Sequence, residues 1–469
     1  MTAPSTDRRS FLRRSSLLAT AALAAPSLGG LVACSTDATA PGYDLNGIRR
    51  RQAPAGQGGY GELKVYEPLP ELSLPAGFHA ARVSMANETM DDGNLVPQAA
   101  DGMAAFGMGE RLVRLVRNHE IRNSATDPLS RPFAGGPTYD ERAGGGTTTI
   151  EVELKPNGEP RRTRHFASLT GTFTNCAGGP TPWGSWITSE ETVAGTGAGF
   201  ARNHGYNFEV SAFADGPVTP VPLKAMGRFS HEAIAVDPRT GVVYETEDRN
   251  PGGFYRFIPN RPGNLAAGGM LQVLVIRGAP AYDTRVGQRV GEVLAAEWVT
   301  IPRPDSDAPT ISSGFVFTQV ASAARFSRLE GCWWGDEGCY FTATSGGNAG
   351  AGQVFKYTPT SASGGELVLV FESPSFDVLD SPDNICISPR GGIVICEDGD
   401  GTNYVRGITP RGEVFDVVRN NVSSSEWAGA CWAPQGRTLF VNMQGSTSAG
   451  STALGGTYAV WGPWESGCL

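Results

Sequence analysis

Short apolar segments separated by turn residues recur along most of the chain. RLVRLV, TTTIEVEL, GVVYETE, LQVLVI and ELVLVF are such segments, and stretches rich in glycine, proline and aspartate separate them. Apolar runs of this length between turn residues are typical of β-strands, and no long amphipathic helix competes with them. The pattern predicts an all-β protein.

The apolar segments belong to a repeated unit. A polar residue precedes a short apolar strand, a turn follows, and a second apolar strand ends at another polar residue. His231-Glu232 and Glu247-Asp248 enclose one unit, and Leu329-Glu330 and Thr344-Ser345 enclose another. The six second strands end at Glu120, Glu190, Glu247, Ser345, Glu397 and Gln444. A unit of roughly 40 to 50 residues with about four strands is typical of propellers, so we predict a six-bladed β-propeller with loop insertions.

Acidic side chains gather at the ends of these predicted strands. Equivalent strand ends lie on one face of a propeller, so the acids should converge at the mouth of its central channel. Any single acid at a strand end can instead cap a turn. Without cations the group would repel itself, because two charges about 4 Å apart cost roughly 4 kcal/mol at an effective dielectric near 20. The candidate metal ligands here are Glu120, Glu190, Glu191, Glu247, Asp248, Asp383, Asn384, Glu397 and Asp398.

Cys176 changes the metal that such a site would prefer. Carboxylate and amide oxygens suit Ca²⁺, whereas a thiolate favours iron or zinc. The chain has no histidine-rich or CxxC pattern of the kind that binds zinc. The alternative is that Cys176 is a small buried residue in the turn Asn-Cys-Ala-Gly-Gly.

The other cysteines leave the redox state open. Two pairs flank predicted hairpin turns, and each pair could be bridged in an oxidising compartment or remain as buried thiols. These pairs are Cys332 with Cys339 and Cys386 with Cys396, while Cys431 and Cys468 could pair or stay free.

The N-terminal segment indicates export. Arg8-Arg9-Ser10-Phe11-Leu12-Arg13 resembles a twin-arginine (Tat) signal, and the apolar run after it is too short for a convincing membrane span. Leu31-Val32-Ala33-Cys34 resembles a lipobox, which would leave a lipid anchor on Cys34; the alternative is a simple cleavage site. We expect a signal peptide at 1–33, a flexible linker at 34–59 and one propeller domain at 60–469, in the periplasm or at the cell surface.

Charge excludes one class of function. The 469 residues carry a formal net charge of −9, with few charged residues for the length. Proteins that bind nucleic acid non-specifically neutralise phosphates with basic patches, so we expect no nucleic-acid partner. We expect a monomer that touches the membrane only through the anchor.

Several motifs together resemble the PhoX-type alkaline phosphatases. They are DGMAAF at 101–106, NHE at 118–120, GTFTNCAGGPTPWGSWITSEE at 171–191, GRFSHEA at 227–233, DSPDNI at 380–385 and CEDG at 396–399. The resemblance implies an exported propeller that hydrolyses phosphate monoesters at a centre of two Fe³⁺ ions and Ca²⁺ ions. It assigns Cys176 and Glu232 to iron, and it assigns oxygen ligands to Glu120, Glu190, Glu191, Asp383, Asn384, Glu397 and Asp398. The context of Glu247-Asp248-Arg249 resembles a shorter subgroup of that family.

The implied mechanism needs no protein nucleophile, because an oxygen bound to the metals would attack phosphorus in line. A cation should hold the phosphoryl oxygens of a small phosphorylated substrate, and Arg249 and Arg406 are the candidates. Either arginine could instead pair with acids at the rim. His119 and His231 could be ligands, but we favour hydrogen bonds to ligands or backbone.

Two other functions fit the same acids. One is a calcium-dependent propeller hydrolase of lactones or organophosphates, which would gain nothing from Cys176. The other is a non-catalytic surface propeller stapled by calcium. Iron content separates the first alternative from the phosphatase.

Overall fold

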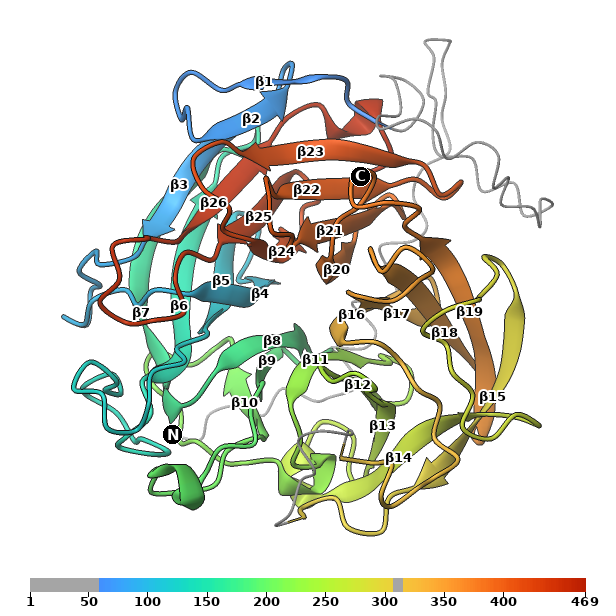
Figure 1. The fold of residues 1–469 in the computed structure, drawn as a ribbon. Coiled ribbons are helices and arrows are strands. Elements are labelled where there is room, and N and C mark those ends of the chain that lie inside the picture. The colour runs from blue at the N-terminus through green and yellow to red at the C-terminus, as the bar shows by residue number, and fades with distance from the viewer. Residues whose placement is uncertain (1–58, 307–314) are drawn as a thin grey trace, which may run out of the picture. The chain divides into compact units, whose positions relative to one another are not determined.

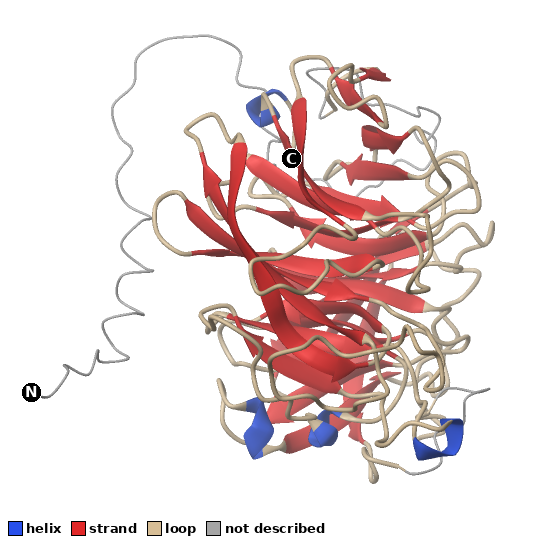
Figure 2. Cartoon of the chain, turned by 90° about the vertical axis from the view of Figure 1, so that its left-hand side faces the viewer, coloured by secondary structure: helices blue, strands red, loops and turns tan. Residues whose placement is uncertain are grey.

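The computed structural model describes residues 59–306 and 315–469, whose regular secondary structure consists almost entirely of antiparallel strands (Figures 1 and 2). The predicted signal peptide, Cys34 and all but the last residue of the predicted linker lie outside the described residues. Within the described residues, no helix is both long and apolar enough to cross a membrane. Four short 3-10 helices interrupt the loops, at Thr196–Ala198, Lys224–Met226, Leu265–Ala267 and Trp464–Ser466.

Three of the sheets are small antiparallel meanders. The first contains β4 (Ala100–Gly107), β5 (Leu112–His119), β6 (Gly145–Leu154) and β7 (Pro160–Thr172). The second contains β8 (Asn175–Pro180), β9 (Ser185–Glu190) and β10 (Asn207–Ser211). The third contains β24 (Trp427–Trp432), β25 (Thr438–Met443), β26 (Gly456–Trp461) and β3 (His79–Met85). Because β3 pairs with β26, strands from the two ends of the domain complete one sheet.

The two larger sheets extend the same pattern. One has six strands, β20 (Pro382–Ile387), β21 (Ile393–Glu397), β22 (Tyr404–Ile408), β23 (Val414–Asn420), β2 (Leu72–Pro75) and β1 (Leu63–Val65). The other has nine. It joins β11 (His231–Val236), β12 (Val243–Glu247), β13 (Phe254–Pro259), β14 (Gly269–Ile276) and β15 (Val293–Thr300) to β19 (Gly364–Glu372), β18 (Gln353–Ser361), β17 (Gly338–Ala343) and β16 (Leu329–Gly335).

The sheets are arranged around a common centre (Figure 1). Strands β4, β8, β11, β16, β20 and β24 lie innermost, and each contacts the next around the ring. The predicted all-β, propeller-like fold is therefore confirmed. Hydrogen bonding gives five sheets in the described residues, because the nine-stranded sheet contains two innermost strands, and the number of blades stays a prediction.

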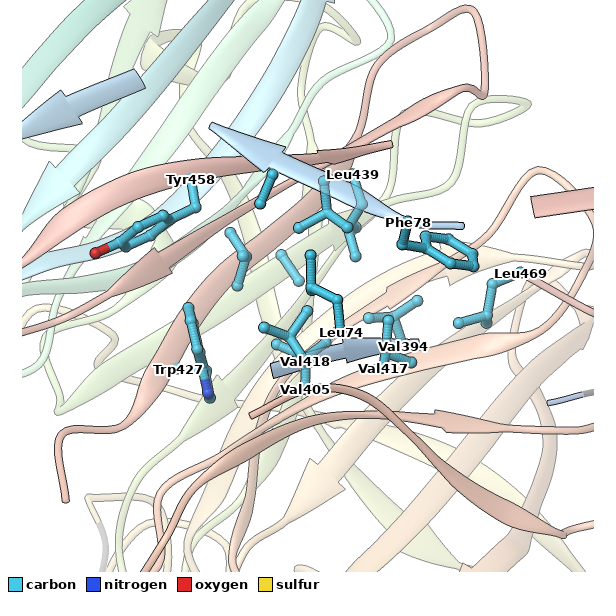
Figure 3. Close-up of a cluster of buried hydrophobic side chains, with 14 of the residues drawn as sticks. Leu74, Phe78, Val394, Val405, Val417, Val418, Trp427, Leu439, Tyr458 and Leu469 are labelled. Carbon is cyan, nitrogen blue, oxygen red and sulfur yellow. The ribbon is translucent and has the colours of Figure 1, made fainter. Parts of the chain in front are cut away.

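Apolar clusters between neighbouring sheets hold the ring together. The cluster in Figure 3 fills the space between the six-stranded sheet and the β24 sheet, where Val405, Val418, Trp427 and Leu439 are fully buried. Burial of one such aliphatic or aromatic side chain contributes about 1.5–3 kcal/mol. The scaffold around the centre is thus rigid enough to fix side chains at its inner strand ends.

The four cysteines of the predicted hairpin pairs are all buried thiols. The Cys332 and Cys339 sulfurs lie 3.2 Å apart. The structure therefore brings the Cys332 and Cys339 thiols together without a disulfide bond.

Candidate metal centre

Each innermost strand begins with a β-bulge, which sets the direction of its first side chains. The pairing register shifts between Asn175 and Gly178 in β8, at the corresponding place in β4, β11, β16 and β20, and one residue later in β24. A bulge inserts an extra residue and redirects the side chains beside it. The first inserted residues are Asp101, Cys176, Glu232, Glu330, Asp383 and Gly429. Five of these six residues are types that bind metals.

The second strand of each unit supplies another set of side chains. The backbone N–H of the residue after this strand donates to the carbonyl of the residue before the inner strand, as between Glu191 and Thr174 (2.8 Å) and between Asp398 and Ser381 (3.0 Å). The same bond recurs in all six units. The residues placed in this way are Glu120, Glu191, Asp248, Thr344, Asp398 and Gln444.

The two sets meet in one cavity of about 240 Å³ at the channel mouth. Its lining is almost wholly polar. It consists of Glu120, Arg122, Cys176, Glu191, Asp248, Arg328, Glu330, Asp383, Asp398, Glu426, Gln444 and Thr447. The fold thus concentrates carboxylates from segments far apart in the sequence.

Ligand atoms around this cavity form four linked groups, here called the arc. Within each group the atoms lie within 4.8 Å of one another, and neighbouring groups share Cys176, Glu232 or Asp383. The groups are Asp101-Glu120-Cys176, Cys176-Glu191-Glu232, Glu232-Glu330-Asp383 and Asp383-Asp398-Glu426. Such spacing allows one cation per group, with the shared residues bridging neighbouring cations.

Glu232 provides the test of whether cations fit here. Its side chain is completely buried, and neither carboxylate oxygen has a hydrogen-bond partner among the described residues. One oxygen of Asp101 is unpartnered in the same way. A buried carboxylate without a partner is strongly unfavourable, whereas a coordinated cation would satisfy it. The residues present therefore fit a metal centre.

Electrostatics supports the same conclusion. Burial, with neighbouring carboxylates, raises the pKa of Glu120 to about 7 against the opposing charge of Arg122. It raises the pKa of Asp383 to about 8. Burial and nearby anions also raise the pKa of Glu232, Glu330 and the Cys176 thiol well above their usual values. Without cations these groups bind protons more tightly than usual, so metal binding and proton release are coupled.

Two arginines line the cavity, and neither was predicted from the sequence. The Arg122 side chain donates to Glu120 and to Glu191 (2.6 Å each). Arg328 donates to both oxygens of Asp248 (3.0 and 3.1 Å) and to Glu330 (2.7 Å). The side chains remain 50% and 41% exposed, so both guanidinium groups are accessible from the mouth.

The sequence model of the family "Alkaline phosphatase PhoX" matches residues 58–447, which is most of the chain. The chain belongs to the PhoX alkaline phosphatase family. The resemblance seen in the sequence motifs is thereby confirmed.

One solved structure supports the fold. Pseudomonas fluorescens PhoX in complex with vanadate, a transition state analogue, is similar with a TM-score of 0.64 at 18% identity, covering 90% of this chain and 99% of that one. XC5397 from Xanthomonas campestris, a gluconolactonase, has a TM-score of 0.42 at 11% identity, covering 88% and 99%. No curated protein sequence matches the chain.

In this PhoX family member, seven of the predicted metal ligands come together around the cavity, six of them in the arc and Asp248 beside it. They are Glu120, Cys176, Glu191, Glu232, Asp248, Asp383 and Asp398. Asn384 lies just beyond, where its side-chain amide donates to Asp383 (2.9 Å) and its oxygen accepts from the Gly429 N–H (2.6 Å). Asn384 thus orients Asp383 and has no free oxygen directed at the cavity.

The structure places three predicted ligands, Glu190, Glu247 and Glu397, outside the cavity. Each is the last residue of a second strand and points into its own sheet, where donors occupy its oxygens. Glu247, for example, accepts from the Gly253 and Phe315 N–H groups (3.0 Å each) and from the Tyr255 hydroxyl (2.5 Å). These carboxylates have no need of a metal.

The two predicted catalytic arginines also lie away from the cavity lining. Arg406 is buried and donates to Glu397 (2.8 Å) and to Asp416, while Arg249 donates to the Asp248 carbonyl (3.0 Å). The structure thus places Arg122 and Arg328 where Arg249 and Arg406 were expected.

His119 and His231 are held by backbone, as favoured from the sequence. His119 Nδ1 bonds the Gln98 carbonyl (2.9 Å), and His231 Nε2 bonds the Gly227 carbonyl (3.1 Å). A repeat signal was available for two residues that the sequence analysis did not select, since Asp101 and Glu330 occupy the same place in the unit as Cys176 and Glu232. Glu426 had no such signal.

Proposed function

We propose that this protein hydrolyses phosphate esters at an iron and calcium centre in the arc. The buried, unpartnered carboxylate of Glu232, which belongs to two of the four groups, carries the proposal. Family membership supports it, because the family is that of the PhoX alkaline phosphatases. The geometry and the family point to the same chemistry.

The donor types suggest how the ions divide. The two groups that share Cys176 combine a thiolate with carboxylates, which suits iron. The two groups that share Asp383 contain only carboxylates, which suit Ca²⁺ because it accepts several oxygen ligands at flexible geometry. Glu232 would bridge the two classes of ion.

When bound, such ions neutralise phosphoryl oxygens and lower the pKa of water. The protein's own contribution is to hold the ester. Arg122 and Arg328 both line the cavity, and each pairs with two different acids there. A guanidinium group has five N–H donors. Each can therefore keep its carboxylate partner and still donate to a phosphoryl oxygen. A cavity of about 240 Å³ admits a phosphate with a small alcohol group, so we propose a small phosphorylated substrate.

The N-terminal motifs extend the proposal to the protein's location. We propose export of the folded, metal-loaded protein by the Tat route, with a lipid anchor on Cys34 and a monomeric enzyme outside the cytoplasm. The residues concerned lie outside the described part of the chain.

Metal analysis combined with a thiol variant tests the proposed function. Protein purified from the exported fraction should contain both iron and calcium and should hydrolyse a phosphomonoester. Cys176→Ser should lose the iron and most of the activity. Cys431→Ser is the matched control, because Cys431 is equally buried but lies in an apolar cluster, and it should keep both.

Two results would contradict the proposal. Calcium without iron, together with full activity in Cys176→Ser, would favour the calcium-dependent hydrolase of lactones or organophosphates. Failure of the iron- and calcium-loaded protein to cleave any phosphate ester would favour the non-catalytic propeller.

A further inference from the structure

We propose that Glu190 and Glu397 are positioning residues, which lock the strand ends that carry the metal-facing Glu191 and Asp398. The inference rests on the proposed function. It assigns a separate role to each member of the acidic pairs at these strand ends.

Glu190 ties three segments together. One of its oxygens accepts from the Phe173 N–H (2.9 Å) and from His204 Nδ1 (2.6 Å). The other accepts from the N–H groups of Gly205 (2.8 Å) and Tyr206 (3.2 Å). Phe173 lies two residues before β8, which carries Cys176, so one buried carboxylate fixes the end of β9 to the start of β8 and to the segment leading into β10.

Glu397 makes the same connection in another sheet. One oxygen accepts from the Asp380 N–H (3.0 Å) and from Arg406 Nε (2.8 Å), and the other accepts from the Tyr404 N–H (3.0 Å). Asp380 lies two residues before β20, just as Phe173 lies two residues before β8. Glu397 therefore fixes Asp398 relative to Asp383, which belong to one group of the arc.

A basic side chain pairs with each of these glutamates and with a second acid. His204 lies between Glu190 and Asp140, with its Nε2 3.5 Å from the Asp140 carboxylate. Arg406 lies between Glu397 and Asp416. Buried carboxylates are tolerated when they are paired and hydrogen-bonded, so neither glutamate requires a metal ion.

The distribution of such residues around the ring links them to the cavity. In four units the residue after the second strand is an acid that lines the cavity. In each of these units the last residue of that strand is polar, and its side chain forms a hydrogen bond with the backbone. The four such pairs are His119-Glu120, Glu190-Glu191, Glu247-Asp248 and Glu397-Asp398. Where the next residue is uncharged, the position is apolar, as in Ala343-Thr344 and Met443-Gln444. A purely structural role would not follow the charge of the neighbour.

Mutually repelling acids explain this association. Carboxylates gathered in a small cavity repel one another once they lose their protons, so a strand end that carries one needs extra bonds to hold it in place for a cation. Bonds that orient metal ligands typically change metal affinity or activity by about 10 to 100 fold when they are removed.

Glutamine variants compared with a matched network test the inference. In Glu190→Gln and Glu397→Gln, an amide replaces a carboxylate that accepts hydrogen bonds from backbone N–H groups. The NH2 group of the amide is a donor and cannot accept these bonds. Glu151→Gln is the control, because Glu151 also pairs with a buried arginine, Arg114, that bonds a second acid, and it lies outside the cavity. Each variant of the full-length protein is measured for iron affinity and calcium affinity by titration, for thermal stability, and for kcat and KM.

We expect iron affinity to fall about 10-fold or more in Glu190→Gln, because Glu191 belongs to a group with Cys176, and calcium affinity to fall by a similar factor in Glu397→Gln. Both affinities should stay unchanged in Glu151→Gln, at comparable losses of thermal stability. Unchanged iron affinity in Glu190→Gln and unchanged calcium affinity in Glu397→Gln, with stability losses like that of Glu151→Gln, would overturn the inference. Both metal affinities are measured independently of hydrolysis, so the result stands even if the proposed activity fails. If Glu397→Gln does not fold, Arg406→Lys keeps the charge, and the same two outcomes apply to it.

Discussion

The two halves of the central channel are made by the same six strands, yet they differ in size and chemistry. The upper half is the acidic cavity of about 240 Å³. The lower half is a cavity of about 20 Å³ lined mainly by glycine, alanine and apolar side chains, among them Trp333. Trp333 packs against four of the hydrophobic clusters and so fills the channel below the acids.

The bulge at the start of each inner strand divides the two halves. Its first inserted residue belongs to the upper half in five strands, and its second lines the lower half in all six. The second residues are Gly102, Ala177, Ala233, Gly331, Asn384 and Ala430. Most are small because the strands approach closely; a Cβ on Gly102 would lie 2.6 Å from the Ala177 Cα. One local irregularity, repeated around the ring, therefore makes an acidic cavity above and a closed floor below.

The largest expected effect comes from the upper half. Glu232→Gln should abolish iron binding and lower phosphatase activity by roughly 100-fold or more, because loss of a shared ligand removes several kcal/mol of transition-state stabilisation. The same change should raise the melting temperature of the metal-free protein, since it removes a buried carboxylate without a partner. Calorimetry with and without metals checks both signs. A lower melting temperature in the metal-free variant would contradict this interpretation of Glu232.

In the lower half the expected effect is on stability. Trp333→Ala should lower the free energy of unfolding by about 3 kcal/mol, because it empties the channel floor, while changing activity only a few fold. Trp334→Ala is a suitable control, since Trp334 is also half-buried but packs against a single cluster. Urea unfolding of both variants gives the comparison. Equal losses of unfolding free energy in the two variants would show that Trp333 does not fill the channel as proposed.

The sequence predicted the upper half better than the lower half. Its repeats located the strand ends and the acids, and its motifs identified the family. They could not tell which member of Glu190-Glu191 or Glu397-Asp398 faces the cavity, because a shift of one residue in where a strand ends exchanges the two faces. The bulges that orient Cys176 and Glu232 depend on register with the neighbouring strand. Arg122 and Arg328 lie in loops, and the periodicity of the sequence does not predict the conformation of these loops.

The smallest expected effect is a dependence of stability on pH that becomes weaker when calcium binds. In the folded protein the pKa of Glu120 is raised from 4.5 to about 7, and that of Asp383 from 3.8 to about 8, chiefly by burial. Below about pH 4 both groups are protonated in the folded and unfolded chains. Between about pH 4 and 8 the folded chain binds more protons, so the metal-free protein should lose stability as the pH rises through this window.

Calcium competes with protons for Asp383, which belongs to both carboxylate-only groups of the arc, so its stabilising effect should grow over the same window. Melting temperatures measured with a chelator and with calcium at pH 5 and pH 8, at constant ionic strength, provide the test. We expect the two conditions to differ by several degrees more at pH 8 than at pH 5. An equal calcium effect at both pH values would mean that protons and calcium do not share the upper half of the channel.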